Sequence, residues 1–217
     1  MDREHTDARL RLGPLADVQI LVEDTRGQPV DFTLFQVLAR RKDLSGDGKP
    51  ETLRPNRGHV PLHPGRWDLA LNPTAGYYVA KFSVVQGENA GRGRADGWNE
   101  IAAAGGPFAV QFVLSPNPGV VRGAVTGANH EPVAGAPVYL EAYDLDARRR
   151  LADLRVARTD MQGKYQFYGL PPGNYRILGT FEYQSPDSAA LDAAGARTVK
   201  VEESRDVALD LELYVLR

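Results

Sequence analysis

The sequence repeats itself once with a spacing of about a hundred residues, and this repeat limits the fold more than any other feature. Gly27-Gln28-Pro29-Val30 in the first half corresponds to His130-Glu131-Pro132-Val133 in the second half. Further along, residues 57–67 (RGHVPLHPGRW) parallel residues 162–175 (QGKYQFYGLPPGNY). Solenoid repeats are only ~20 to 50 residues long, so a period of this size predicts duplication of a whole domain.

Both halves alternate apolar residues with a period of two, which is typical of half-buried β-strands. The clearest case places Phe108, Val110, Phe112 and Leu114 on one face. Gly 22 and Pro 15 fall between the apolar runs, where turns are needed. We therefore predict an all-β protein of two tandem sandwiches, with strands near residues 17–23, 32–38, 67–71, 78–84, 108–114, 121–125, 138–143, 165–168, 175–178, 199–201 and 207–213.

Proline-rich residues separate the two halves. Pro116 and Pro118 cannot continue a central strand, so residues 116–119 are expected to form a short, fairly stiff linker. The predicted organisation is a disordered or extended tail over 1–14, a sandwich over 15–115, the linker, and a second sandwich over 120–217. Each sandwich is expected to contain one short helix before its last strands, over 96–104 and over 185–195, where Ser185 and Pro186 suit a helix start.

The charge balance and residue usage exclude several classes of protein. A net charge of -2 provides no basic field, so we expect no nucleic-acid partner. No run approaches the roughly 18 apolar residues of a membrane span, so we expect no membrane insertion. With Cys 0, disulfides and thiolate sites are excluded. The first eleven residues (MDREHTDARLR) are charged; we expect an extracellular, cell-surface or periplasmic protein whose export signal lies outside this sequence.

A family resemblance follows from the motifs of the second half. Residues 121–125 (VRGAV), 131–138 (EPVAGAPV), 158–167 (RTDMQGKYQF) and 170–175 (LPPGNY) resemble carboxypeptidase regulatory-like domains, which are grouped with transthyretin-like and Cna B-type sandwiches. The resemblance covers 118–217 strongly. It covers 15–115 more weakly, because the Thr-Asp-x-x-Gly turn is missing there. It implies an immunoglobulin-like sandwich topology, and topology alone does not define an activity.

The residues offer little for catalysis, and we predict no enzyme and no cofactor. His59 and His63 are four residues apart, but Pro61 and Pro64 rule out the helix that would align them on a metal. None of the histidines has the His-x-x-Glu spacing of metallocarboxypeptidases. The segment Asp43-Leu44-Ser45-Gly46-Asp47-Gly48 is a weak calcium-loop candidate through Asp43, Ser45 and Asp47, with an ordinary hairpin loop as the alternative.

Exposed aromatic rings are the remaining candidates for ligand binding, because they can stack on sugars or anchor proteins. Trp98 lies beside Gly97 in an expected loop or helix start, and Tyr77 and Tyr78 flank the same region. We predict Trp98 as the principal ligand-binding residue and Tyr77 and Tyr78 as secondary ones. For Tyr78, burial inside a strand is the competing interpretation.

The predicted function is a non-catalytic binding or scaffolding segment of a larger bacterial surface, periplasmic or secreted protein. Such a segment recognises a protein or carbohydrate, or spaces neighbouring domains, and its edge strands could pair into a dimer. One alternative is an accessory domain of a secreted peptidase or other hydrolase. A second is a metal-dependent enzyme with a site between the modules, built from groups such as His59, His63 and Asp68.

Overall fold

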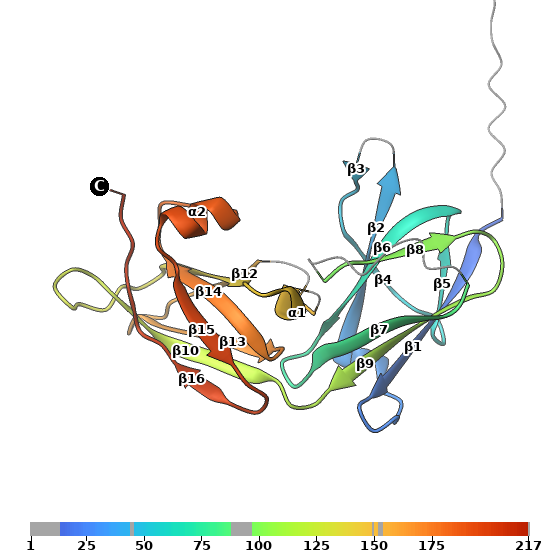
Figure 1. The fold of residues 1–217 in the computed structure, drawn as a ribbon, viewed down its shortest axis with the longest axis horizontal. Coiled ribbons are helices and arrows are strands. Elements are labelled where there is room, and N and C mark those ends of the chain that lie inside the picture. The colour runs from blue at the N-terminus through green and yellow to red at the C-terminus, as the bar shows by residue number, and fades with distance from the viewer. Residues whose placement is uncertain (1–13, 44–45, 88–96, 149, 152–153, 217) are drawn as a thin grey trace, which may run out of the picture.

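The computed structural model describes residues 14–43, 46–87, 97–148, 150–151 and 154–216. These residues form two β-sandwich modules that lie side by side, each with its own buried core. Figure 1 shows the first module in blue to green and the second in yellow to red, joined where β9 leads into β10. The predicted tail over 1–14 lies outside the described residues except for Pro14.

The first module packs two sheets, with strand orders β5-β1-β9-β7 and β3-β2-β6-β8, and β4 pairs with β2. Its first and last strands, β1 and β9, run parallel to each other. The elements are β1 (Ala16–Asp24), the 3-10 helix η1 (Phe32–Leu34), β2 (Phe35–Asp43), β3 (Gly46–Asp47), β4 (Glu51–Leu53), β5 (His59–Leu62), β6 (Gly65–Pro73), β7 (Tyr78–Gln86), β8 (Asn99–Ala103) and β9 (Phe108–Ser115).

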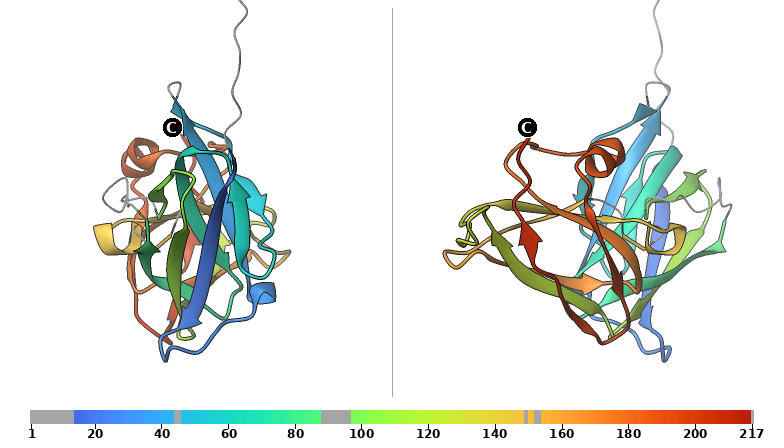
Figure 2. Two further views of the ribbon diagram at one scale, coloured as in Figure 1. Left: turned by 90° about the vertical axis from the view of Figure 1, so that its right-hand side faces the viewer. Right: turned by 60° about the vertical axis from the view of Figure 1, so that its left-hand side comes forward.

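The second module also packs two sheets. One has the order β12-β11-β14-β15; the other has the order β13-β10-β16, and β17 also pairs with β10. Helix α2 lies over the outer face of the first of these sheets (Figure 2). The elements are β10 (Gly119–Thr126), β11 (Pro137–Ala142), α1 (Leu145–Arg148), β12 (Arg155–Arg158), β13 (Lys164–Leu170), β14 (Gly173–Gly179), α2 (Ser188–Ala193), β15 (Arg197–Val201), β16 (Asp206–Ala208) and β17 (Leu211–Glu212).

The predicted alternation of apolar residues is confirmed in the cores. Along β1 the side chains alternate between buried and more exposed, and Val18, Ile20 and Val22 are buried. The four large side chains of β9 are all buried between the sheets. A separate set of apolar residues, from Val121 to Leu211, fills the second sandwich. Each half thus buries its own apolar surface, which is the main force that stabilises a sandwich.

The duplication is visible in equivalent backbone features. In the first module β1 pairs parallel with β9 and β2 pairs antiparallel with β6; in the second module β10 pairs parallel with β16 and β11 pairs antiparallel with β14. The Val30 amide donates to Val22 O at 3.1 Å, and the Val133 amide donates to Val125 O at 3.0 Å. Gly65 and Gly173, which begin β6 and β14, have φ angles of 144° and 156°. Glycine tolerates this conformation readily, which explains its presence in both copies.

The helix predicted over 96–104 is wrong. Residues 99–103 form strand β8, which pairs antiparallel with β6 from Leu69↔Asn99 to Gly65↔Ala103. The run of alanines favoured a helix locally, but an exposed edge of β6 and the burial of Ile101 and Ala103 favour a strand. A helix within 185–195 is confirmed as α2, but its predicted start at Ser185 and Pro186 is wrong. The helix begins at Ser188 because Asp187 is its cap: a side-chain oxygen of Asp187 accepts from the Ala190 amide at 2.8 Å.

Candidate functional site

Trp98 is buried, so the prediction that it forms an exposed platform is wrong. Its side chain is 1% exposed, and the Arg40 guanidinium lies 4.4 Å above the centre of its ring. Tyr78 is also buried, at 3% exposed, whereas Tyr77 is half-buried against the first core. The three aromatic residues therefore do not form an exposed stacking surface.

The histidines and Asp68 are not brought together. His59 Nδ1 lies 3.0 Å from Asp17 Oδ2 at the surface, and the carbonyl of His63 accepts from Trp67 Nε1 at 2.9 Å. Asp68 lies in the opposite sheet, paired with Arg40. Within the described residues, no three His, Cys, Asp or Glu side chains are placed to hold a metal ion.

The calcium-loop candidate falls on the connection between β2 and β3. Ser45 and the side chains of Asp43 and Asp47 lie outside the described part of the chain. The backbones of residues 42–43 and 46–47 pair antiparallel, so the segment forms a hairpin.

Buried charges on the outer face of the β2-β6-β8 sheet are paired with one another. Asp68 is completely buried and accepts from Arg40 Nε at 3.0 Å, while Lys42 Nζ lies 3.1 Å from Glu100 Oε2. Arg66 also pairs with Glu100. Burial alone would raise the pKa of Glu100, but the hydrogen bonds from Lys42 and Arg66 outweigh it and lower that pKa. This network joins three strands and gives each charged group a partner of opposite charge.

A second network occupies the matching face of the second module. Arg176 is 5% exposed and pairs with Glu141 on β11 and with Asp192 on α2. The guanidinium also lies 5.0 Å from the centre of the Tyr143 ring. The network therefore attaches α2 to the sheet. Its charges are satisfied within the module, as in a structural ion-pair cluster.

The junction between the modules is formed by the turn between β15 and β16. The Tyr78 hydroxyl on β7 donates to Glu203 Oε1, and the Ser204 amide donates to the linker carbonyl of Asn117 at 3.2 Å. The Arg205 carbonyl accepts from the amide of Val120, at the start of β10, at 2.9 Å. One turn thus contacts the first module, the linker and the first strand of the second module.

Backbone packing adds to these hydrogen bonds. Gly169, at the end of β13, approaches the turn before β7: a Cβ atom at Gly169 would lie 3.3 Å from Tyr77 O and 3.5 Å from Ala75 Cα. Burial, followed by the hydrogen bond to Glu203, raises the pKa of Tyr78, so its hydroxyl stays a donor at neutral pH.

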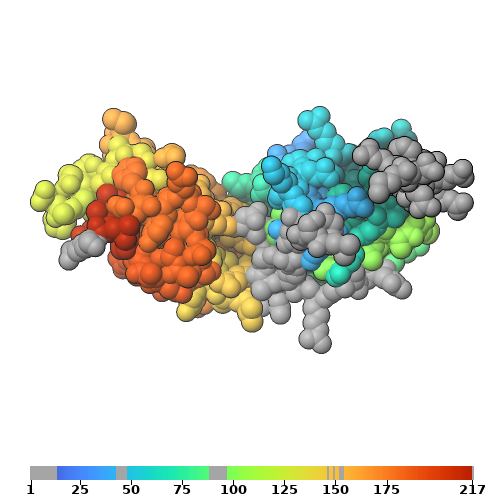
Figure 3. Space-filling model, turned by 90° about the horizontal axis from the view of Figure 1, so that it is seen from above, coloured from blue at the N-terminus to red at the C-terminus, as the bar shows by residue number. Residues whose placement is uncertain are grey.

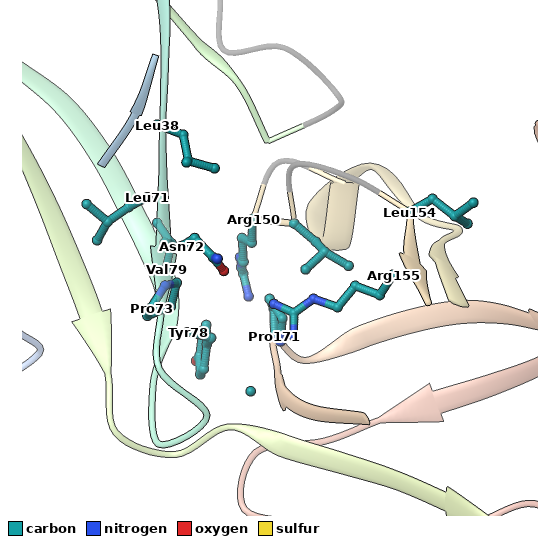
Figure 4. A pocket seen from close by; sticks show the side chains of 12 residues that line it. Leu38, Leu71, Asn72, Pro73, Tyr78, Val79, Arg150, Leu154, Arg155 and Pro171 are labelled. Atoms are coloured by element: carbon teal, nitrogen blue, oxygen red, sulfur yellow. The ribbon is translucent and has the colours of Figure 1, made fainter. Parts of the chain in front are cut away.

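Beside this junction lies a pocket of about 210 Å³, lined from both modules. The first module contributes Asn72 and Tyr78, with apolar side chains such as Leu71; the second contributes Arg150 and Arg155. Figure 4 shows both guanidinium groups pointing into the space beside Tyr78. Seen from above, the two modules form two lobes (Figure 3).

The junction residues Glu203, Arg150 and Arg155 were not predicted from the sequence. Glu203 lies in the β15–β16 turn, Arg150 in the loop after α1 and Arg155 at the start of β12, and nothing in their local pattern indicates which residues they meet. Of the predicted candidates, Tyr78 belongs to the junction through its hydroxyl, and Tyr77 approaches it through its backbone carbonyl; neither contributes an exposed ring.

The fold and the junction define a tandem β-sandwich protein. Residues 120–214 match the carboxypeptidase regulatory-like domain, which confirms the resemblance of the second module. No curated protein matches the chain.

Solved structures give remote matches. The Bacillus anthracis TIE protein is 12% identical, with a TM-score of 0.34, over 93% of this chain and 34% of its own. A streptococcal ancillary pilin is 13% identical, with a TM-score of 0.33, over 98% of this chain and 64% of its own. The minor pilin GBS52 of Streptococcus agalactiae is 13% identical, with a TM-score of 0.34, over 94% of this chain and 98% of its own. The chain thus spans a third to two thirds of the first two proteins, and TM-scores this low support no argument about function.

None of the helices in the described part of the chain is long and apolar enough to cross a membrane.

Proposed function

We propose that the chain is a non-catalytic scaffold segment of a larger extracellular, cell-surface or periplasmic protein, and that it holds neighbouring domains at a fixed separation and angle. The single observation that carries this proposal is that the β15–β16 turn forms hydrogen bonds with Tyr78, Asn117 and Val120. A linker fixed at both ends transmits the orientation of one module to the other, whereas a flexible linker would uncouple them. The proposed units are 15–115 and 120–217, with 116–119 between them.

The location of charge supports a structural role over a catalytic one. The buried acids Asp68 and Glu100 face Arg and Lys partners, and Arg176 faces Glu141. Catalytic groups need a perturbed pKa in an accessible cleft, and these groups are instead neutralised within the sheets. A place beside a secreted peptidase or hydrolase is a second form of the same scaffold role, favoured by the family matched over 120–214.

The orientation of the modules in solution tests the proposal. Residual dipolar couplings from both modules should fit one alignment tensor, as expected of a rigid pair. Glu203→Ala should separate the two tensors while each module keeps its fold. Glu202→Ala is the matched control, because Glu202 lies next in sequence but pairs with Lys200 at 3.0 Å. Independent tensors in the unaltered protein would overturn the proposal.

A further inference from the structure

The pocket beside Tyr78 contains two arginines whose charge no carboxylate neutralises among the described residues. Arg155 Nη1 donates to Tyr168 O at 2.9 Å, whereas the side chain of Arg150 forms no such bond with the residues that the structure describes. In contrast, Arg40, Arg66 and Arg176 each pair with a carboxylate. The pocket therefore holds two guanidinium groups that form no ion pair within the described part of the chain, in a partly enclosed space.

The nearby carboxylates are engaged elsewhere. Glu203 accepts from Tyr78, and Asp144 accepts from the amide of Asn174 at 2.6 Å and from the amide of Ala147 at 2.7 Å. Burial lowers the pKa of Arg155, which reflects the cost of holding its charge away from water. An anion in the pocket would offset that cost, because guanidinium groups bind carboxylates through paired hydrogen bonds.

We propose that this pocket binds a small carboxylate with a compact apolar body, held by Arg150 and Arg155. The apolar walls, formed by residues such as Leu71, Val79 and Leu154, fit the body of the ligand. Asn72 offers an amide beside the two guanidinium groups. At about 210 Å³ the space is smaller than the roughly 300–1,000 Å³ pockets of drug-sized ligands, so it selects a ligand of about one ring.

Titration of the full chain, followed by amide chemical shifts in nuclear magnetic resonance spectra, tests the proposal. Benzoate should give saturable shifts at Asn72, Tyr78 and Gly169, and benzamide, which has the same shape without charge, should not. Arg150→Gln and Arg155→Gln should each weaken benzoate binding about tenfold or more, as expected for a charged hydrogen-bond partner. Binding should also weaken as salt is added.

Arg158→Gln is the matched control. Arg158 also lies on β12, and its Nη1 likewise donates to a backbone carbonyl, that of Gly135 at 3.1 Å, but it does not line the pocket. This variant should keep benzoate affinity within about twofold. Spectra that match the unaltered protein away from the pocket establish that each variant is folded. Equal effects of benzoate and benzamide, stronger binding of inorganic phosphate, or equal loss in Arg158→Gln would each overturn the proposal.

Discussion

Asp68 and Arg176 occupy equivalent positions in the two modules and carry opposite charges. Asp68 lies on β6, directly across from Arg40 on β2, and Arg176 lies on β14, directly across from Glu141 on β11. Each residue forms an ion pair with the residue opposite. The duplicated fold has thus kept a cross-strand ion pair on the outer face of one sheet while its polarity is reversed.

Removing one member of such a pair should be costly. Asp68→Ala leaves buried positive charge without its fully buried partner, and we expect a loss of about 3–5 kcal/mol in the free energy of unfolding. Urea denaturation measures it. Asp206→Ala is the control, because its pair with Arg122 at 3.3 Å is about half exposed and should contribute at most about 1 kcal/mol. Equal losses in the two variants would contradict this prediction.

Arg176→Met should loosen α2 specifically. The guanidinium of Arg176 joins Glu141 on the sheet to Asp192 on the helix, so its removal takes away this ion-pair attachment of α2 and leaves the hydrogen bond from the Ser188 hydroxyl to Glu141. Amide hydrogen exchange over 188–193 should become faster. Exchange within β6 of the first module should stay the same. If α2 exchanges at the original rate, the apolar contacts around Leu191 are sufficient to hold it.

Gly123→Ala should separate strand β10 from the chain that leads to β17. A Cβ atom at Gly123 would lie 1.8 Å from Leu209 O, and backbone cannot yield as a flexible side chain can. We expect the free energy of unfolding, measured by chemical denaturation, to fall by about 1–3 kcal/mol. Gly76→Ala, where no heavy atom lies within 4 Å, should stay within about 0.5 kcal/mol of the unaltered protein. A neutral Gly123→Ala would mean that residues 209–210 can move away freely.

The protein should lose stability in alkali. Burial raises the pKa of Tyr165 and Tyr175, whose hydroxyls donate to Leu209 O at 2.5 Å and to Pro171 O at 2.6 Å. Unfolded tyrosines ionise near pH 10, so the native state holds protons that the unfolded state releases. The resulting stability is fully present below about pH 10 and declines as pH rises above it.

Tyrosinate absorbance followed together with circular dichroism checks this expectation. Part of the absorbance change from the 9 tyrosines should appear only as the fold is lost. Complete ionisation near pH 10 with native circular dichroism would show that Tyr165 and Tyr175 titrate in the folded protein and would rule out the predicted cause.

Much of the fold could be predicted because alternation and turn residues are local. Val18, Ile20 and Val22 indicate a one-sided strand whatever their partner, and the repeated glycine at positions 65 and 173 indicates the same turn twice. Strand β8 could not be predicted, because its pairing with β6 depends on a distant segment. Helix α1 did carry a signal: the Ala147 amide donates to Asp144 Oδ1 at 2.7 Å, as expected of a capping residue.

The candidate site was harder to predict for the same reason. The sequence identified Tyr78 as aromatic and inside a strand, but its partner Glu203 belongs to the other module. Trp98 is buried beside Arg40, which lies on β2, a strand distant in the sequence. Such contacts join residues that are far apart in the sequence, and local patterns do not contain them.

The parallel pairing of first and last strands determines how the chain responds to tension. In the first module the pairing runs unbroken from Val18↔Phe108 to Asp24↔Leu114, so pulling β1 and β9 apart along their length loads these hydrogen bonds in shear, all at once. In the second module the pairing of β10 is divided between β16 and β17. Tension passes from the β1–β9 pairing to the β10–β16 pairing through residues 116–118. The second module should therefore unfold first.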